Sequence, residues 1–189
     1  IKKLRIKKIE ELKKEGEEIY PSHCFRNQTI ENTLKNFSLW SRQKKNIWVA
    51  GRIISIRFHG GIVFVDLRDE SGVMQIVFKK EEVKKFESLE KYLDISDFIE
   101  VKGYPFTTKR GEKSLLAKEW RLISKSLRPL PSEWYGLKDS EERFRKRYLD
   151  LLLNPEVKKH FETRSLIIKS MRDFFNNEGF IEVETPVLQ

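Results

Sequence analysis

The chain has 189 residues, 39% of them hydrophobic, and carries 38 Lys and Arg against 29 Asp and Glu, a formal net charge of +9. This length and composition are typical of a globular protein with one small domain and a substantial part of a second. The positive excess favours a polyanionic partner, but a lysine-rich surface that only contacts water explains it equally well.

The sequence offers no disulfide framework, metal site or membrane anchor. Cys24 is the only cysteine, and His23, His59 and His160 lack Cys/His metal-ligand spacing. No run approaches the roughly 18 apolar residues of a membrane span, and the first residues carry charges where a signal peptide has its apolar core. We therefore expect a cytoplasmic protein with no membrane partner and no metal ligands.

Two helices are predicted in an N-terminal helical extension over residues 1–45. The first spans IKKLRIKKIEELKKEG, with apolar residues near helical spacing and Gly16 at its end. Its basic side chains either contact RNA or form a solvated face. The second carries Ile30, Leu34, Phe37 and Trp40 at spacings of four, three and three, a stripe typical of core packing.

Residues 46–126 change from helical to alternating hydrophobicity. Strands are predicted over residues 46–58, 62–69, 73–78, 97–108 and 113–124, with a helical patch at 81–94. Three strands, a helix and two strands match the Greek-key OB barrel, in which strands 2 and 3 bind oligonucleotides. An SH3-like barrel is the alternative, and the helix before the fourth strand argues against it.

A linker and the start of another domain follow. Two prolines and a glycine in SLRPLPSEWYG begin a linker over residues 127–153. Within residues 154–189, Asn154 and Pro155 are typical of a helix start, Gly179 of its end, and FIEVE of a strand. The fold class is therefore α+β. Because Ile1 is no initiator methionine and no closing element follows the strand, we expect a longer parent protein.

Alternation assigns the side chains of the first three strands to two faces, because neighbours along a strand point to opposite sides. The inward rows are Ile56 and Phe58, then Val63, Val65 and Leu67, then Met74, Ile76 and Phe78. Arg57, Phe64 and Gln75 therefore point outward.

Such a face fits an unpaired nucleotide, since a ring stacks on a base, a carboxamide reads its edge and a guanidinium binds base or phosphate. Alternatively, the two N-terminal helices cover Phe64, and alternation leaves both interpretations open.

The segment VAGRIISIRFHGGIVFVDLRDESGVMQIVF resembles the anticodon-binding domain of class IIb aminoacyl-tRNA synthetases, the lysyl, aspartyl and asparaginyl enzymes. The runs RIKKIEELKKEGEEIYPSHCF and SLRPLPSEWYGLKDSEERFRKRYLDLLLN are similar to the lysine–tRNA ligases of that class. The resemblance covers essentially the whole chain and implies tRNA(Lys) as the partner. An aspartyl or asparaginyl enzyme is one alternative, and a stand-alone single-stranded RNA- or tRNA-binding module is another.

The resemblance also implies roles for individual residues. Phe64 falls on the family's aromatic that stacks on the central anticodon base, Gln75 on its amide partner and Arg57 on a nearby arginine. Glu112, in the turn before the last strand, falls on an acidic residue that reads the first anticodon position. His59 and Arg110 border this surface and are further candidates for it.

The stretch GFIEVETPVLQ and the helix before it are similar to motif 1 of class II synthetases, which builds the homodimer interface, here at Phe180, Val183 and Pro186. Motifs 2 and 3, which hold ATP in that class, do not occur in this sequence. The resemblance thus implies no catalytic residue and no cofactor in this chain, which is expected to be inactive alone. ATP, Mg²⁺ and lysine are implied for the complete enzyme, which attaches lysine to tRNA through lysyl-adenylate.

Overall fold

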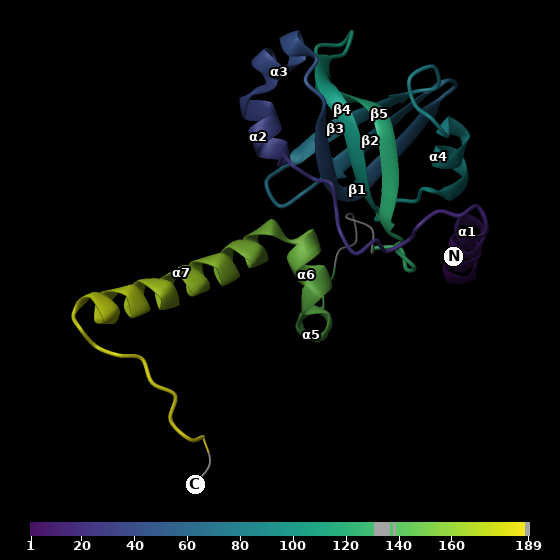
Figure 1. The fold of residues 1–189 in the computed structure, drawn as a ribbon. Coiled ribbons are helices and arrows are strands. Elements are labelled where there is room, and N and C mark those ends of the chain that lie inside the picture. The colour runs from purple at the N-terminus through teal and green to yellow at the C-terminus, as the bar shows by residue number, and fades with distance from the viewer. Residues whose placement is uncertain (131–136, 138, 188–189) are drawn as a thin grey trace. The chain divides into compact units, whose positions relative to one another are not determined.

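The computed structural model describes residues 1–130, 137 and 139–187, which fall into two compact units, Ile1–Pro129 and Leu130–Gln189 (Figure 1). The first unit combines N-terminal helices with a five-stranded barrel, and the second is helical over its described part. The predicted α+β fold class is confirmed.

Five strands close into a barrel in the order β1-β2-β3-β5-β4. The strands are β1 (Ile47–His59), β2 (Ile62–Arg68), β3 (Val73–Lys79), β4 (Phe98–Thr107) and β5 (Lys113–Ser124), and α4 (Phe86–Tyr92) lies between β3 and β4. Strands β3 and β5 pair in parallel, whereas the other neighbours are antiparallel. This is the predicted order of three strands, a helix and two strands, and it closes the barrel without a free sheet edge.

The barrel interior contains the predicted inward rows. Every such residue of β2 and β3 is at most 2% exposed, and Ile56 of β1 packs against the core. Phe58 differs from the expectation, because it pairs with the buried Val63 yet remains 43% exposed. It lies at the end of β1, beside the exposed hairpin residues 59–61, where the barrel no longer covers its inner face.

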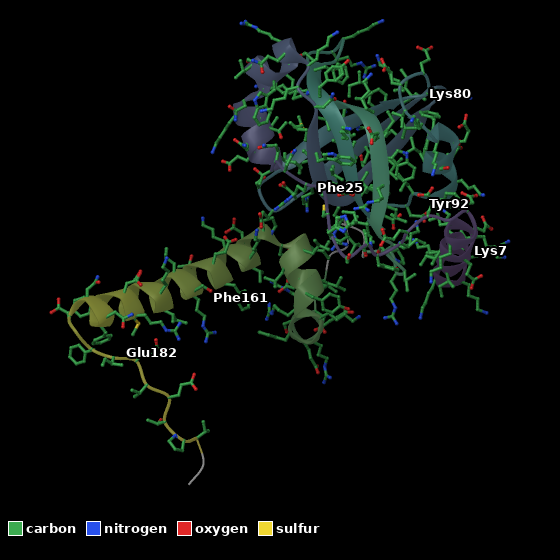
Figure 2. The ribbon with its side chains drawn as sticks, in the orientation of Figure 1. Lys7, Phe25, Lys80, Tyr92, Phe161 and Glu182 are labelled. Atoms are coloured by element: carbon green, nitrogen blue, oxygen red, sulfur yellow. The ribbon has the colours of Figure 1, made fainter. Side chains whose placement is uncertain are left out.

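The first helix, α1 (Lys2–Lys14), ends as predicted before Gly16, whose φ of +77° is the left-handed conformation that glycine adopts readily. Lys7 points away from the barrel (Figure 2). Arg5 does not, because it is 7% exposed and its guanidinium donates to the main-chain oxygen of Ser126 at 2.6 Å. One basic residue of α1 thus anchors the helix to the barrel.

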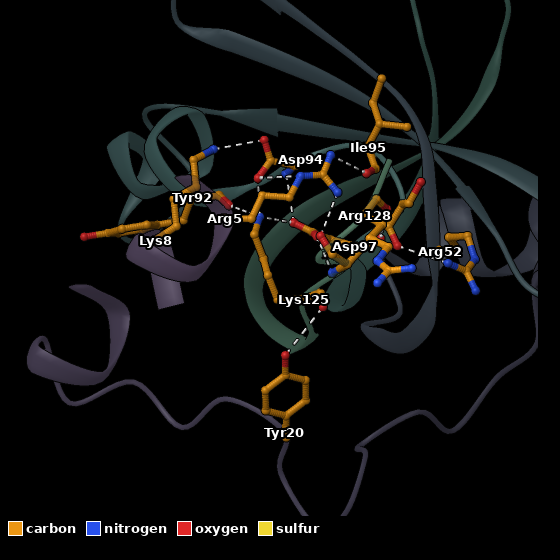
Figure 3. Close-up of polar contacts among 12 residues, drawn as sticks. Arg5, Lys8, Tyr20, Arg52, Tyr92, Asp94, Ile95, Asp97, Lys125 and Arg128 are labelled. Carbon is orange, nitrogen blue, oxygen red and sulfur yellow. Dashed lines mark hydrogen bonds and ion pairs between the residues drawn. The ribbon is translucent and has the colours of Figure 1, made fainter. Parts of the chain in front are cut away.

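A buried ionic cluster lies where α1 meets the barrel (Figure 3). The ammonium of Lys125 lies 2.5 Å from a carboxylate oxygen of Asp97 and 2.5 Å from one of Asp94, and Lys8 of α1 contacts Asp94 at 3.0 Å. Burial raises the pKa of Asp97 despite its hydrogen bonds. Burial also acts to raise the pKa of Asp94, but hydrogen bonds from Lys125 and Lys8 outweigh it and lower that pKa.

The second predicted helix is in fact two helices, α2 (Ile30–Lys35) and α3 (Phe37–Gln43). They meet at Asn36, whose side-chain amide donates to the main-chain oxygen of Asn32 at 2.9 Å. An asparagine that bonds to the main chain in this way competes with the regular helical hydrogen bonds. The apolar stripe is nevertheless buried, with Ile30, Phe37 and Trp40 at most 7% exposed.

The second unit contains α5 (Ser140–Arg145), α6 (Arg147–Leu153) and α7 (Pro155–Asn177), and Asp150 connects them. Its fully buried carboxylate accepts from Arg143 at 2.8 Å and from the amide of Asn154 at 2.6 Å. Burial acts to raise the pKa of Asp150, but these bonds outweigh it and lower the pKa. Asn154 was expected to cap α7 with its side chain, and it instead bonds to Asp150.

The strand predicted at residues 180–184 is not formed, although Gly179, at φ +84°, ends the preceding helical segment as expected. A strand requires a hydrogen-bonded neighbour. Among the residues that the structure describes, none pairs with this segment.

Candidate nucleic-acid interface

Strand register determines which side chains share the outer surface of the barrel. Residues directly opposite each other in an antiparallel pair point to the same face. Arg57 of β1 lies opposite Phe64 of β2, and Asp66 of β2 lies opposite Gln75 of β3. Because Phe64 and Asp66 are two residues apart on one strand, all four share a face. We call these four residues and Glu112 the outer cluster.

Phe64 is the aromatic member of the outer cluster. It belongs neither to the buried core nor to the hydrophobic side chains packed against that core, and it is partly exposed. The ring of His59 lies 6.0 Å from the Phe64 ring in an edge-on arrangement. The alternative position for Phe64, as a core residue beneath the N-terminal helices, is therefore not the observed one.

Arg57 is held by Asp66, a residue that the sequence argument did not select. The guanidinium lies 3.2 Å from one carboxylate oxygen of Asp66, and the hydroxyl of Ser55 donates to the other. The Arg57 side chain keeps 49% of its surface exposed, so the pair contributes little to stability and mainly orients the guanidinium. Alternation from Phe64 would have placed Asp66 on this face.

Gln75 lies on the predicted face but is covered rather than open to water. Only 7% of the residue is exposed. Its amide nitrogen donates to a carboxylate oxygen of Glu112 at 2.9 Å, and its amide oxygen accepts from the hydroxyl of Ser114 at 3.0 Å. Gln75 shares the outer face, as alternation predicted, but its side chain is not open to solvent, because Glu112 of the β4–β5 turn and Ser114 of the neighbouring strand β5 bond to it.

The turn between β4 and β5 brings Glu112 to this site. Main-chain and side-chain bonds between Thr108 and Glu112, at 3.0 and 3.1 Å, close the turn, and Gly111 has a φ of +84°. Glu112 thereby contacts a residue 37 positions away in the sequence. Arg110 lies exposed on the same turn and makes no hydrogen bond or ion pair with any described residue.

The outer cluster thus combines a partly exposed ring, a guanidinium, a carboxamide and an exposed carboxylate. None of these groups forms a nucleophile with a base or a phosphate-binding loop. Within residues 1–130, 137 and 139–187, no group of three or more His, Cys, Asp or Glu side chains has an arrangement that could hold a metal ion. The groups present can stack on an aromatic ring and form hydrogen bonds.

The residues predicted for motif 1 lie in the second unit and are exposed. Phe180 is 63% exposed, with its ring 5.5 Å from that of Phe175, and Val183 is 72% exposed. Pro186 is also exposed, and Glu182 of the same segment accepts from the Arg172 guanidinium at 3.0 Å. No helix of the described residues has the length and apolar character needed to cross a membrane.

Comparison with protein families agrees with this geometry. Residues 47–123 match the family described as OB-fold nucleic acid binding domain. Residues 139–189 match the family described as tRNA synthetases class II (D, K and N), where the letters are one-letter amino-acid codes. The barrel therefore has the OB fold, and the segment after it is similar to class II tRNA synthetases.

Individual relatives narrow this similarity to lysine–tRNA ligases. The chain is 44% identical to the lysine–tRNA ligase of Syntrophomonas wolfei over 100% of its own length, 40% identical to that of Helicobacter pylori strain 26695 over 97%, and 37% identical to that of Thermotoga maritima over 99%. It spans 38% of the length of each of these relatives. The predicted resemblance to lysine–tRNA ligases is confirmed.

Proposed function

We propose that this chain recognises the anticodon of tRNA(Lys) through the outer cluster, as part of a lysine–tRNA ligase. The observation that carries the proposal is the convergence of Arg57, Phe64, Gln75 and Glu112, which come from three strands and a turn, on one face of an OB barrel. OB folds bind single-stranded nucleic acid on this part of the barrel.

Each side chain has a separate task in this proposal. The ring of Phe64 stacks on the central anticodon base, and the carboxamide of Gln75 reads the edge of that base. Arg57, oriented by Asp66, binds the base or an adjacent phosphate. Glu112 reads the first anticodon base. His59 supports the edge of the Phe64 ring, and Arg110, exposed on the turn, contacts the RNA backbone.

In the complete protein we propose that the synthetase domain activates lysine with ATP and Mg²⁺ and transfers it to the 3′ end of the bound tRNA in the cytoplasm. The described residues hold no group of three or more His, Cys, Asp or Glu side chains that could bind a metal ion. Their contribution is to select the tRNA on which the reaction takes place.

We also propose that α7 and the segment after it join two copies of the complete protein. Leu166, Ile167, Met171, Phe174 and Phe175 are each 47% to 63% exposed, and they line a shallow apolar hollow along α7. Phe180, Val183 and Pro186, which follow α7 in the chain, are also exposed, and the Phe180 ring contacts that of Phe175. An apolar area of this kind on a helix is typical of a homodimer interface.

The anticodon proposal is tested by titrating the chain with a tRNA(Lys) anticodon stem-loop. Phe64→Ala should weaken binding by about 1–3 kcal/mol, the usual value of one base stacked on an aromatic ring. Phe144→Ala is the matched control, because Phe144 is 73% exposed and lies in the second unit, outside the outer cluster.

Equal affinity of the Phe64→Ala variant and the unchanged chain would remove Phe64 from the site. Equal affinity of the unchanged chain for stem-loops with unrelated anticodons would instead indicate a general single-stranded RNA-binding module, which is the alternative function.

A further inference from the structure

The outer face of the barrel continues beyond the outer cluster as far as β4. Phe64 of β2 lies opposite Val77 of β3, and Val77 pairs with Leu116 of β5. Leu116 in turn lies opposite Tyr104 of β4. Residues directly opposite each other in a sheet point to the same face. This row across four strands therefore has a partly exposed aromatic ring at each end and two buried aliphatic side chains between them.

Two lysine ammonium groups lie over this face. Lys79 follows Val77 by two residues on β3, so alternation directs it to the same side, and its ammonium nitrogen lies 6.0 Å from the centre of the Phe106 ring of β4. The ammonium nitrogen of Lys118 lies 5.6 Å from the centre of the Tyr104 ring. Such contacts orient a lysine, because its apolar stem lies along the ring while its charged head stays in water. We call Lys79 and Lys118 the lysine pair.

The lysine pair lies close to the ring that is proposed to stack on a base. Phe64 is directly opposite Val77, so Lys79 is a diagonal neighbour of Phe64, at a usual Cβ separation of about 7–8 Å. Gln75 is the diagonal neighbour on the other side of Val77. The ring is thus flanked along β3 by a carboxamide at one end and a flexible cation at the other, and the cation can follow the backbone of a strand whose base is on the ring.

The charge of the lysine pair is only partly neutralised. Lys118 donates to the carboxylate of Glu82, and Lys79 makes no ion pair with any described residue. The hydrogen bond from Lys118 lowers the pKa of Glu82, and the charge of Lys79 lowers it further. Lys118 and Glu82 keep 34% and 35% of their side-chain surfaces exposed, so a phosphate can replace Glu82 beside Lys118 at little cost.

We propose that the lysine pair binds phosphates of the RNA strand next to the base stacked on Phe64. The inference rests on the proposed function for the identity of that RNA as tRNA(Lys). Phosphate contacts position a nucleic acid without reading its sequence, so the pair supplies affinity and no selectivity. Each contact also releases counterions, which makes log K fall more steeply with log[salt], by about 0.7 for each phosphate of a single strand.

The test is a titration of a tRNA(Lys) anticodon stem-loop with the full 189-residue chain at about 50 mM and about 200 mM salt. Lys79→Gln combined with Lys118→Gln should weaken binding mainly at low salt and reduce the loss of affinity over this range by about 7-fold, because two phosphate contacts are removed. Selectivity among anticodons should be retained. The control combines Lys7→Gln and Lys14→Gln, at exposed lysines of α1, and should leave the salt slope unchanged.

Glu82→Gln should have the opposite effect on affinity. It removes the carboxylate that competes with a phosphate for Lys118, so binding at low salt should become tighter. Glu81→Gln makes the same change of charge at the exposed neighbouring residue, and it should strengthen binding less. A damaged fold would not produce tighter binding, so this variant tests the pair independently of stability.

Two results would overturn the role of the lysine pair and leave the proposed function intact. One is an equal salt slope of the double lysine variant and the unchanged chain, which includes a variant weakened by the same factor at both salt concentrations. The other is a Glu82→Gln variant that binds no more tightly than Glu81→Gln. Equal binding of stem-loops with unrelated anticodons by the unchanged chain would overturn the proposed function instead, whereas a reduced salt slope of the double variant would still support the lysine pair.

Discussion

Lys125 at the end of the barrel and Asp97 before β4 form an ion pair in which both side chains are fully buried, with 2.5 Å between the ammonium nitrogen and a carboxylate oxygen (Figure 3). The same ammonium donates to the main-chain oxygen of Tyr92 at 2.5 Å. A buried charge without a partner is far more costly than a buried pair. The pair therefore holds the chain after β5 against the loop that follows α4.

Lys125→Met should lower the free energy of unfolding by about 3–5 kcal/mol, because it leaves the Asp97 carboxylate buried without its counter-charge. Lys125→Met combined with Asp97→Asn should recover part of that loss, since the uncompensated charge is then gone. Urea unfolding followed by circular dichroism measures both effects, with Lys14→Met, at an exposed lysine of α1, as the control. A double variant no more stable than Lys125→Met would contradict this account.

Asp69 joins the β2–β3 turn to α2, and its ionised carboxylate should make the free energy of unfolding depend on pH. Its carboxylate accepts from the main-chain nitrogens of Ile30, Ser71 and Gly72 at 2.8 to 3.0 Å. Burial acts to raise the pKa of Asp69, but these bonds and that from the Ser71 hydroxyl outweigh it and lower the pKa below its ordinary value of 3.8. The stabilisation is therefore present above that value and is lost as the pH falls through the lowered folded-state pKa.

Asp69→Asn should accordingly cost about 1–3 kcal/mol of unfolding free energy at neutral pH. The difference between this variant and the unchanged chain should shrink as the pH falls below about 4. Urea unfolding at several pH values measures it, with Asp173→Asn, at an exposed position of α7, as the control. A difference that stays constant down to acidic pH would show that the ionised carboxylate is not the stabilising group.

Glu112→Ala should remove discrimination at the first anticodon base, because the proposed reader of that base is lost. Stacking on Phe64 does not depend on Glu112, so affinity for the matched stem-loop should fall less than in Phe64→Ala. Stem-loops that differ only at the first position measure the effect. Glu70→Ala, an exposed glutamate in the turn between β2 and β3, is the matched control. If selectivity at the first base is retained, Glu112 does not read that base, and its hydrogen bond to Gln75 is its only role at this site.

Phe174→Asp should reduce self-association of the chain, because it places a charge in the apolar hollow of α7, where Phe174 is 60% exposed. Sedimentation velocity over a range of protein concentrations measures the association. Lys169→Asp changes the charge of the same helix at an exposed residue outside the hollow, and it should leave association unchanged. Equal association of the Phe174→Asp variant and the unchanged chain would argue against α7 as the interface.

The sequence alone was sufficient to predict the five strands, the helix between β3 and β4 and the inward rows of β2 and β3. Alternation is a local property with a period of two residues, so it can be recognised without knowing what a strand packs against. The same alternation placed Phe64 opposite the core, where it is partly exposed beside His59. The resemblance that pointed to lysine–tRNA ligases was equally local, since it rested on contiguous runs of residues.

Only the tertiary structure decided that Gln75 is covered, that Asn36 separates two helices and that residues 180–184 lack a strand partner among the described residues. Gln75 is shielded in part by Glu112, which lies 37 residues later in the turn between β4 and β5. The hydrogen bond between these two side chains forms only when the barrel closes. Ser114 reaches Gln75 for the same reason, because barrel closure brings β5 beside β3 as its parallel neighbour. Local patterns determine which face a side chain occupies, whereas contacts between distant segments determine what covers it.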